Sequence, residues 1–105
     1  PDGRVLYFSR APIPSVTKNG KSPMYQQTGV MAFTLGFLQK FSTLPQTPLE
    51  VIESVDMLRV LEHGFPIHVV LHDRETIGID TPADRTRGEA LLAQDPITKN
   101  YLGNI

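Results

Sequence analysis

Cysteine is absent from all 105 residues. Disulfide bonds and thiolate metal sites are therefore excluded, which is compatible with a cytoplasmic protein. A large excess of either charge is also lacking. Because the net charge is only −1, nothing indicates a nucleic acid or an anionic membrane as a partner. With 40% apolar and 20% charged residues, the composition is typical of a globular domain or of a part of one.

Long hydrophobic runs are missing too. No apolar run approaches the ~20 residues that a membrane-spanning helix needs. The opening residues Pro1–Arg4 lack the apolar region of a signal peptide, and the first methionine is Met24. We therefore expect the sequence to begin inside a longer protein, just before a strand.

Familiar catalytic motifs cannot be found. There is no Gly-rich phosphate loop, no serine nucleophile elbow, no HExxH motif and no Cys/His metal spacing. Residue patterns alone therefore predict only an α/β domain with one aspartate at the end of a strand.

What the sequence does contain is a series of short apolar runs separated by turn residues. Runs rich in β-formers predict strands at residues 5–8, 24–33, 67–72 and 77–79. The segment 11–23 holds three prolines and a glycine among polar residues, so we expect a long loop there.

The helix with the clearest boundaries is expected from Thr47 to Gly64. Thr47 is the N-cap, Pro48 occupies the first helical position, and Glu50 completes a capping box. Gly64 is placed to end the helix. Further helices are expected at 35–41, at 82–93 after the cap Thr81, and as a terminal turn after Asp95. This order of elements suits a three-layer α/β sandwich.

Four blocks, in order, resemble one family. They are residues 6–14 (LYFSRAPIP), 48–64 (PLEVIESVDMLRVLEHG), 67–69 (IHV) and 78–84 (GIDTPAD). Together they span nearly the whole chain, roughly residues 5–92. They resemble the C-terminal half of CMP-Kdo synthetases, the 3-deoxy-manno-octulosonate (Kdo) cytidylyltransferases. The resemblance implies half of a Rossmann-like, nucleotide-sugar-transferase sandwich. It also implies the reaction of CTP with a 3-deoxy-2-ulosonic acid, for lipopolysaccharide or capsule synthesis, to give a CMP-sugar and pyrophosphate.

The same resemblance implies Mg²⁺ as cofactor and a homodimer. In this family the nucleotide loop and a further metal-binding aspartate lie in the N-terminal half, which this sequence lacks. We therefore expect the isolated chain to be inactive. We also expect it to self-associate, because sheet edges and an apolar face would otherwise stay uncovered.

Asp80 is the candidate metal ligand. It follows a predicted strand, where ligands of α/β sheets bind, and Mg²⁺ prefers carboxylate oxygens. It also matches the family aspartate that helps to bind the metal. The alternative is that Asp80 only interacts with the N-terminus of the next helix.

Arg10 is a candidate substrate-binding residue. It matches the family arginine that contacts the acidic sugar, and a guanidinium suits a carboxylate. The alternative is a solvated arginine at a strand end. Asp56 falls at a family glutamate that binds sugar hydroxyls and keeps the acceptor on a shorter arm. Its alternative role is a weak i, i+3 pair with Arg59.

Three neighbouring positions depart further from the family. Met57 replaces a glutamine, Gln27 replaces a histidine, and Met31 replaces a tyrosine. Gln27 can still hydrogen-bond a ligand, whereas Met31 is expected in the core. Because a pocket built for hydroxyls discriminates strongly between hydroxyl patterns, these changes leave the sugar open. Three hypotheses remain: a Kdo cytidylyltransferase fragment, a relative for another sugar acid, and a non-enzymatic dimerisation or binding module.

Overall fold

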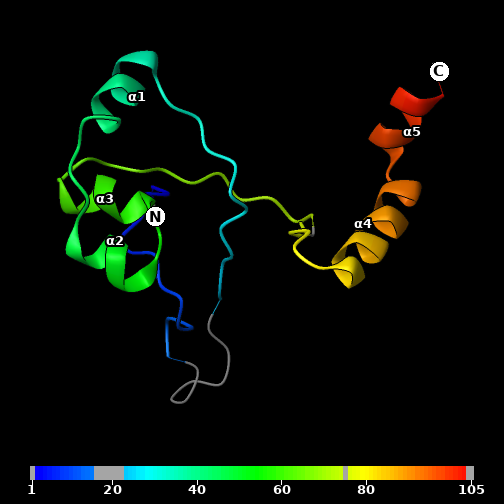
Figure 1. Ribbon diagram of the computed structural model, residues 1–105, viewed down its shortest axis with the longest axis horizontal. Helices are drawn as coiled ribbons and strands as arrows, with labels where there is room; N and C mark the ends of the chain where they lie inside the picture. The colour runs from blue at the N-terminus through cyan, green and yellow to red at the C-terminus, as the bar shows by residue number, and fades with distance from the viewer. Residues whose placement is uncertain (1, 16–22, 75, 104–105) are drawn as a thin grey trace. The chain divides into compact units, whose positions relative to one another are not determined.

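The computed structural model describes residues 2–15, 23–74 and 76–103 (Figure 1). The chain divides into two compact units, Pro1–His72 and Asp73–Ile105, which are described separately. The first unit contains α1 (Leu35–Phe41), α2 (Pro48–Glu53) and α3 (Met57–Glu62), and the second contains α4 (Pro82–Gln94) and α5 (Pro96–Leu102). Across the described ranges, no helix has the length and apolar character that crossing a membrane requires. Part of the loop expected at 11–23 lies outside the described residues.

The single helix expected from Thr47 to Gly64 is wrong: it is two helices. α2 ends at Ser54, whose φ of 55° and ψ of 45° are left-handed, and α3 starts after Asp56. The sequence has no glycine at this position to signal the end of a helix, and the left-handed conformation is unusual for serine. The predicted end is confirmed, because Gly64 follows the C-cap of α3 with a φ of 81°.

The break lets α2 and α3 pack against each other and form the centre of the first unit. Met57, Leu58 and Val60 on α3 are 5%, 1% and 1% exposed, and they are the buried apolar side chains of the described residues. The first unit also contains a cluster of four phenylalanines. The ring centroids are 6.3 Å apart for Phe33 and Phe37, 5.8 Å for Phe33 and Phe41, and 5.2 Å for Phe37 and Phe65. Phe37 and Phe41 on α1 are half-buried in this cluster.

The segments expected to be strands are extended but are not assigned as strands in the described residues. One antiparallel bridge joins Arg4 and His68, flanked by hydrogen bonds from Val5 N to Ile67 O (2.8 Å) and from Val69 N to Gly3 O (2.9 Å). A strand persists only when neighbouring strands satisfy its backbone groups, and this pairing is too short to do so. The pairing does join two of the predicted strand segments, and the three-layer sandwich stays a prediction.

In the second unit, both helices begin at the cap residues that the sequence predicts. Thr81 Oγ1 accepts from Asp84 N (3.2 Å) and Asp84 Oδ2 accepts from Thr81 N (2.9 Å), which is the predicted capping box at the start of α4. Asp95 Oδ2 accepts from Thr98 N (2.7 Å), so the expected terminal turn is a short helix, α5. Both helices carry proline in the first turn, as predicted.

Candidate functional site

Arg10 lies at the C-terminal end of α2, where its side chain holds the helix end. Its Nε donates to Glu53 O (2.8 Å) and its Nη2 donates to Ser54 O (2.7 Å). A positive charge is favourable there because the last carbonyls of a helix carry partial negative charge. This contact explains how Ser54 can end α2 without a glycine.

The Arg10 contacts leave part of the guanidinium available. Within the described residues, two of its five N–H donors are used, both on the edge shared by Nε and Nη2. The remaining N–H groups of Nη1 and Nη2 form the end-on edge, and the side chain is exposed. This edge matches the two oxygens of a carboxylate. Arg10 is therefore neither a freely solvated side chain nor a fully satisfied one.

Glu53 connects the Arg10 segment to α2. Its Oε2 accepts from the backbone N of Arg10 (2.8 Å), and its Oε1 accepts from the Tyr7 hydroxyl (2.8 Å). The Arg10 N–H and then the Tyr7 hydroxyl hold the pKa of Glu53 below its ordinary value. The same hydrogen bond raises the pKa of Tyr7, because the neighbouring carboxylate disfavours a phenolate. The sequence did not single out Glu53, because this contact joins residues 43 and 46 positions apart.

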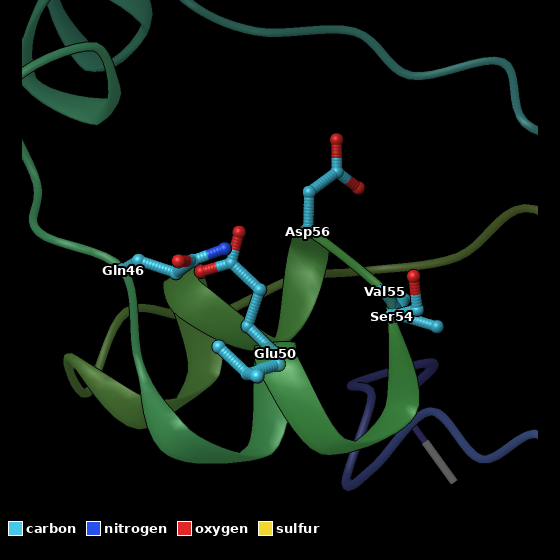
Figure 2. Close-up of a pocket in the computed structure, with 6 residues that line it drawn as sticks. Gln46, Glu50, Ser54, Val55 and Asp56 are labelled. Atoms are coloured by element: carbon cyan, nitrogen blue, oxygen red, sulfur yellow. The ribbon is translucent and has the colours of Figure 1, made fainter.

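Asp56 borders an open hollow beside α2 and α3. The hollow has a volume of about 600 Å³ and is lined by Gln46, Glu50, Val51, Ser54, Val55 and Asp56. Figure 2 shows the Asp56 carboxylate projecting away from the backbone of α3. Asp56 occupies the N-cap position of α3 but its side chain makes no capping hydrogen bond. Its carboxylate is thus available as a hydrogen-bond acceptor.

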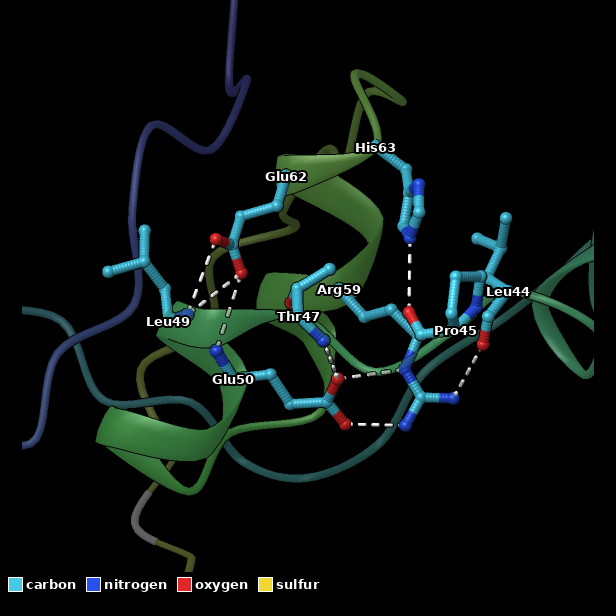
Figure 3. A network of polar contacts seen from close by, with 8 residues as sticks. All are labelled: Leu44, Pro45, Thr47, Leu49, Glu50, Arg59, Glu62 and His63. Atoms are coloured by element: carbon cyan, nitrogen blue, oxygen red, sulfur yellow. Dashed lines mark hydrogen bonds and ion pairs between the residues drawn. The ribbon is translucent and has the colours of Figure 1, made fainter.

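The alternative role of Asp56, a pair with Arg59, is not what the structure shows. Arg59 instead binds Glu50 side-on, with Nε to Oε2 at 2.8 Å and Nη2 to Oε1 at 2.5 Å (Figure 3). Glu50 also accepts from Thr47 N (3.2 Å), which is the predicted carboxylate half of the capping box. The hydrogen bonds from Arg59 are the main reason why the pKa of Glu50 lies below its ordinary value. Of this ion pair, Glu50 lines the hollow.

Two further side chains secure the same helices. Glu62 accepts from Leu49 N (3.1 Å) and Glu50 N (3.4 Å), so it caps the start of α2 as Arg10 caps its end. His63 contacts Pro45 O through Nε2 (3.1 Å) at the end of α3, the helix-terminal position expected for it. Glu62 and Arg10 therefore have positions complementary to the dipole of α2.

The positions that depart from the family differ in exposure. Met57 is buried, at 5% exposure, so it belongs to the core and cannot contact a ligand as the family glutamine does. Met31 is 37% exposed, so its expected core position is wrong within the described structure. The reason is that residues 23–33 have no covering layer there. Gln27, in the same segment, is exposed.

Asp80 stands before α4 in the second unit. Its backbone N–H donates to Asp84 Oδ2 (3.3 Å), and Asp84, rather than Asp80, caps the helix. Among the described residues, no group donates a hydrogen bond to the exposed Asp80 carboxylate. The helix-capping alternative for Asp80 is therefore met by Asp84, and Asp80 is left with free oxygens.

The Asp80 carboxylate can be compared with the ligands that a magnesium ion requires. In the described ranges no three His, Cys, Asp or Glu side chains come close enough to hold a metal. A single free carboxylate nevertheless fits the way proteins bind Mg²⁺, with one or two carboxylates beside phosphate oxygens and waters. Asp80 thus fits as one ligand of a site that other groups must complete.

A second hollow, of about 520 Å³, lies within the second unit. It is lined by Arg74, Ile77, Ile79, Gly88, Leu91, Leu92, Gln94 and Asp95. Its wall is largely apolar, and it forms where Ile79 packs against Gly88 of α4. That contact places the 77–79 segment, and Asp80 after it, beside the start of α4.

Comparison with known proteins identifies relatives of this chain. No protein-family model matches the chain. A "3-deoxy-manno-octulosonate cytidylyltransferase" of Anaeromyxobacter sp. (strain Fw109-5) is 48% identical over 95 residues, which is 90% of this chain and 39% of that protein. Proteins of the same name from Syntrophobacter fumaroxidans and Acaryochloris marina are 45% and 40% identical over 90% and 89% of the chain, and 38% of each relative is covered.

These matches confirm the resemblance that the four sequence blocks predicted. The chain spans about two fifths of the length of these relatives, with 38–40% of each covered. A match of this extent is consistent with the predicted C-terminal part. Over nearly its whole length, the chain resembles the corresponding stretch of the 3-deoxy-manno-octulosonate cytidylyltransferases.

Proposed function

We propose that this chain is the sugar-binding part of a cytidylyltransferase that transfers CMP from CTP to 3-deoxy-manno-octulosonate and releases pyrophosphate. The observation that carries the proposal is 40–48% identity to proteins of that name over almost the whole chain. The free end-on edge of Arg10 supports it, since the proposed substrate is a carboxylic acid. Because the chain matches only part of those proteins, CTP binding falls to groups outside it.

The side chains have separate tasks in this proposal. Arg10 binds the sugar carboxylate, and Asp56 and Gln27 accept or donate hydrogen bonds to sugar hydroxyls. Asp80 is one ligand of the magnesium ion, which neutralises phosphate charge when bound. Asp56 and Gln27 are exposed, as this task requires. Catalysis by positioning of this kind needs no proton donor from the chain itself.

The proposal extends to the setting of the reaction. We propose a cytoplasmic protein, because CTP is made and used there, and a homo-oligomer with a three-layer α/β sandwich. Large apolar side chains support the last two, because Leu6 and Val70 in the paired segments are 90% and 93% exposed and need a covering layer. The product would serve lipopolysaccharide or capsule synthesis.

A different sugar acid is the second candidate for the substrate. It is favoured by the burial of Met57, which removes from the surface a position that binds hydroxyls in the family. Losing one polar contact shifts discrimination between sugars that differ at a hydroxyl. The two candidates share Arg10, because both substrates carry a carboxylate.

The test is to place this chain in the Anaeromyxobacter relative instead of the stretch that it matches. Pyrophosphate release is then measured with CTP, Mg²⁺ and either 3-deoxy-manno-octulosonate or another 3-deoxy-2-ulosonic acid. Activity with the first sugar supports the proposal, and a preference for the second supports the other candidate. A folded chimera without activity on either would instead favour a non-enzymatic dimerisation or binding module.

The metal role has its own variant in the same chimera. Asp80→Asn is expected to lower kcat roughly a hundredfold and to raise the Mg²⁺ concentration required, because a charged ligand becomes neutral. Asp73→Asn is the matched control, since Asp73 is also an exposed aspartate of the second unit. Equal activity of the two variants would remove Asp80 from the site.

A further inference from the structure

Glu53 is a charged residue of the first unit whose position helix capping does not explain. Its carboxylate turns toward the segment 7–10 and binds it at two points, the Tyr7 hydroxyl and the Arg10 backbone N–H, both at 2.8 Å. Arg10 returns the contact by binding the Glu53 backbone carbonyl through Nε at 2.8 Å. The two residues therefore hold each other through both side chains and both backbones.

This reciprocal contact restricts the Arg10 guanidinium. The backbone of Arg10 is fixed by Glu53 Oε2, and the inner edge of its guanidinium is fixed by the carbonyls of Glu53 and Ser54. An arginine side chain otherwise has many rotamers, and ordering it during binding would lower the affinity. With the inner edge held, the outer edge is already oriented before a ligand arrives.

We infer that Glu53 is a positioning residue that orients Arg10 for the carboxylate of an acidic substrate. This inference rests on the proposed function, in which Arg10 binds the sugar acid. Glu53 does not contact the substrate, because both of its oxygens are occupied by Tyr7 and Arg10. Like-charge repulsion also makes a free carboxylate an unsuitable partner for an acid.

A structural role alone would give a different pattern of effects, and Glu62 provides the comparison. Glu62 is also a carboxylate on this helix pair, but it binds the N-terminal N–H groups of α2 rather than the Arg10 segment. Glu62→Ala therefore weakens α2 without changing the Arg10 segment. Glu53→Ala instead frees the Arg10 backbone and so loosens the guanidinium, although the carbonyls that accept from it remain. Any loss that comes only from a weaker α2 must appear in both variants.

The first readout uses the full 105-residue chain and requires no activity. Hydrogen exchange of the Arg10 Nε–H is followed by NMR in the wild type, Glu53→Ala and Glu62→Ala. We expect exchange to be faster by about tenfold in Glu53→Ala and unchanged in Glu62→Ala, because only the first loses the contact that holds Arg10. Equal protection in all three proteins would overturn the positioning role.

The second readout uses the chimera with the Anaeromyxobacter relative. Glu53→Ala is expected to raise the KM for the acidic sugar about tenfold, with the KM for CTP and kcat nearly unchanged. Glu53→Gln keeps one carbonyl acceptor and should recover part of the affinity. Glu62→Ala should leave the KM for the sugar at the wild-type value.

The outcomes separate the proposed function from the positioning role of Glu53. An inactive wild-type chimera contradicts the proposed function, while the Nε–H exchange still decides whether Glu53 positions Arg10. An active chimera in which Glu53→Ala changes both KM values equally, or matches Glu62→Ala, overturns the inference alone. Loss of kcat without a change in the KM for the sugar would have the same meaning.

Discussion

The two units of the chain place their polar side chains in different ways. In the first unit, Glu53 contacts Tyr7 and the Arg10 backbone across 46 and 43 residues, and Arg59 contacts Glu50 across nine. In the second unit, Thr81, Asp84 and Asp95 make their side-chain hydrogen bonds within four residues. The first unit is organised by contacts between segments, and the second by helix capping.

This difference bears on how each candidate site is formed. Arg10 depends on the fold of the first unit, because its partners lie in α2. Asp80 depends on the local start of α4 and on the packing of Ile79 against Gly88. Damage to the core should therefore release Arg10, while Asp80 should respond only to changes close to it. The following predictions separate these two cases.

The largest effect is expected in the core of the first unit. Leu58 is 1% exposed, so Leu58→Ala removes buried methyl groups and should lower the free energy of unfolding by about 3 kcal/mol. Leu92→Ala in α4 is the control, because Leu92 is 53% exposed and should cost less than about 1 kcal/mol. Urea unfolding measures both. Equal losses would mean that the second unit has a core of similar strength.

The next effect concerns the Glu50–Arg59 pair and its pH dependence. Hydrogen bonds from Arg59 lower the pKa of Glu50 in the folded chain, so the pair stabilises the fold above the ordinary pKa of 4.5. This contribution is lost as the pH falls through the lowered folded-state value. We expect Arg59→Leu to raise the pKa of Glu50, seen in its carboxyl carbon signal, and to make unfolding less sensitive to acid.

The control for this titration lies in the other unit. Arg85→Leu removes an arginine that pairs with Glu89 at an exposed site, so the pKa of Glu50 should not change. A rise of the Glu50 pKa in Arg85→Leu would show that general charge, and not the contact with Arg59, lowers it.

A smaller effect, of opposite sign, is expected at Gly88 in α4. A Cβ at this position would lie 2.9 Å from Ile79 Cδ1, which is too close. However, Ile79 is 56% exposed and its end can rotate away, whereas alanine favours a helix over glycine by about 1 kcal/mol. Gly88→Ala should therefore raise the free energy of unfolding by about 0.5 kcal/mol in thermal melts followed by circular dichroism.

Gly36 in α1 is the matched position for this change. No atom lies within 4 Å of a Cβ there, so Gly36→Ala measures the helix preference without an obstacle. If Gly88→Ala destabilises while Gly36→Ala stabilises, the contact between Ile79 and α4 is stiffer than its exposure indicates.

Helix starts could be predicted from the sequence because their signals are local. Thr34, Thr47, Thr81 and Asp95 all occupy the N-cap positions of the helices expected after them, and the proline after three of them is in place. Thr47 differs from the others, because its Oγ1 accepts no hydrogen bond within the described residues. The break at Ser54 could not be predicted, since Arg10 stabilises it from 44 residues away. Local patterns carry no information about such a partner.

The residues of the candidate site could likewise be predicted only where their signals are local. The residue types of Arg10, Asp56 and Asp80 were evident, and all three have oxygens or N–H groups left to bind a ligand. The contact of Glu53 with Tyr7 and Arg10 was not evident, because these partners lie 46 and 43 residues away in the sequence. The pairing of Arg59 with Glu50 instead of Asp56 likewise depends on how α3 turns back against α2.

The smallest effect is expected for the exposed pair of Arg85 and Glu89 on α4. Arg85 Nε lies 2.9 Å from Glu89 Oε1, but the side chains are 75% and 62% exposed, so water screens the attraction. Glu89→Gln keeps the length and helix preference of the side chain and should change the free energy of unfolding by less than about 0.5 kcal/mol. A double-mutant cycle with Arg85→Gln in urea gives the coupling directly. A coupling as large as that of Glu50 with Arg59 would contradict the difference between the two units. An exposed pair four residues apart would then stabilise the fold as strongly as a pair that joins two helices.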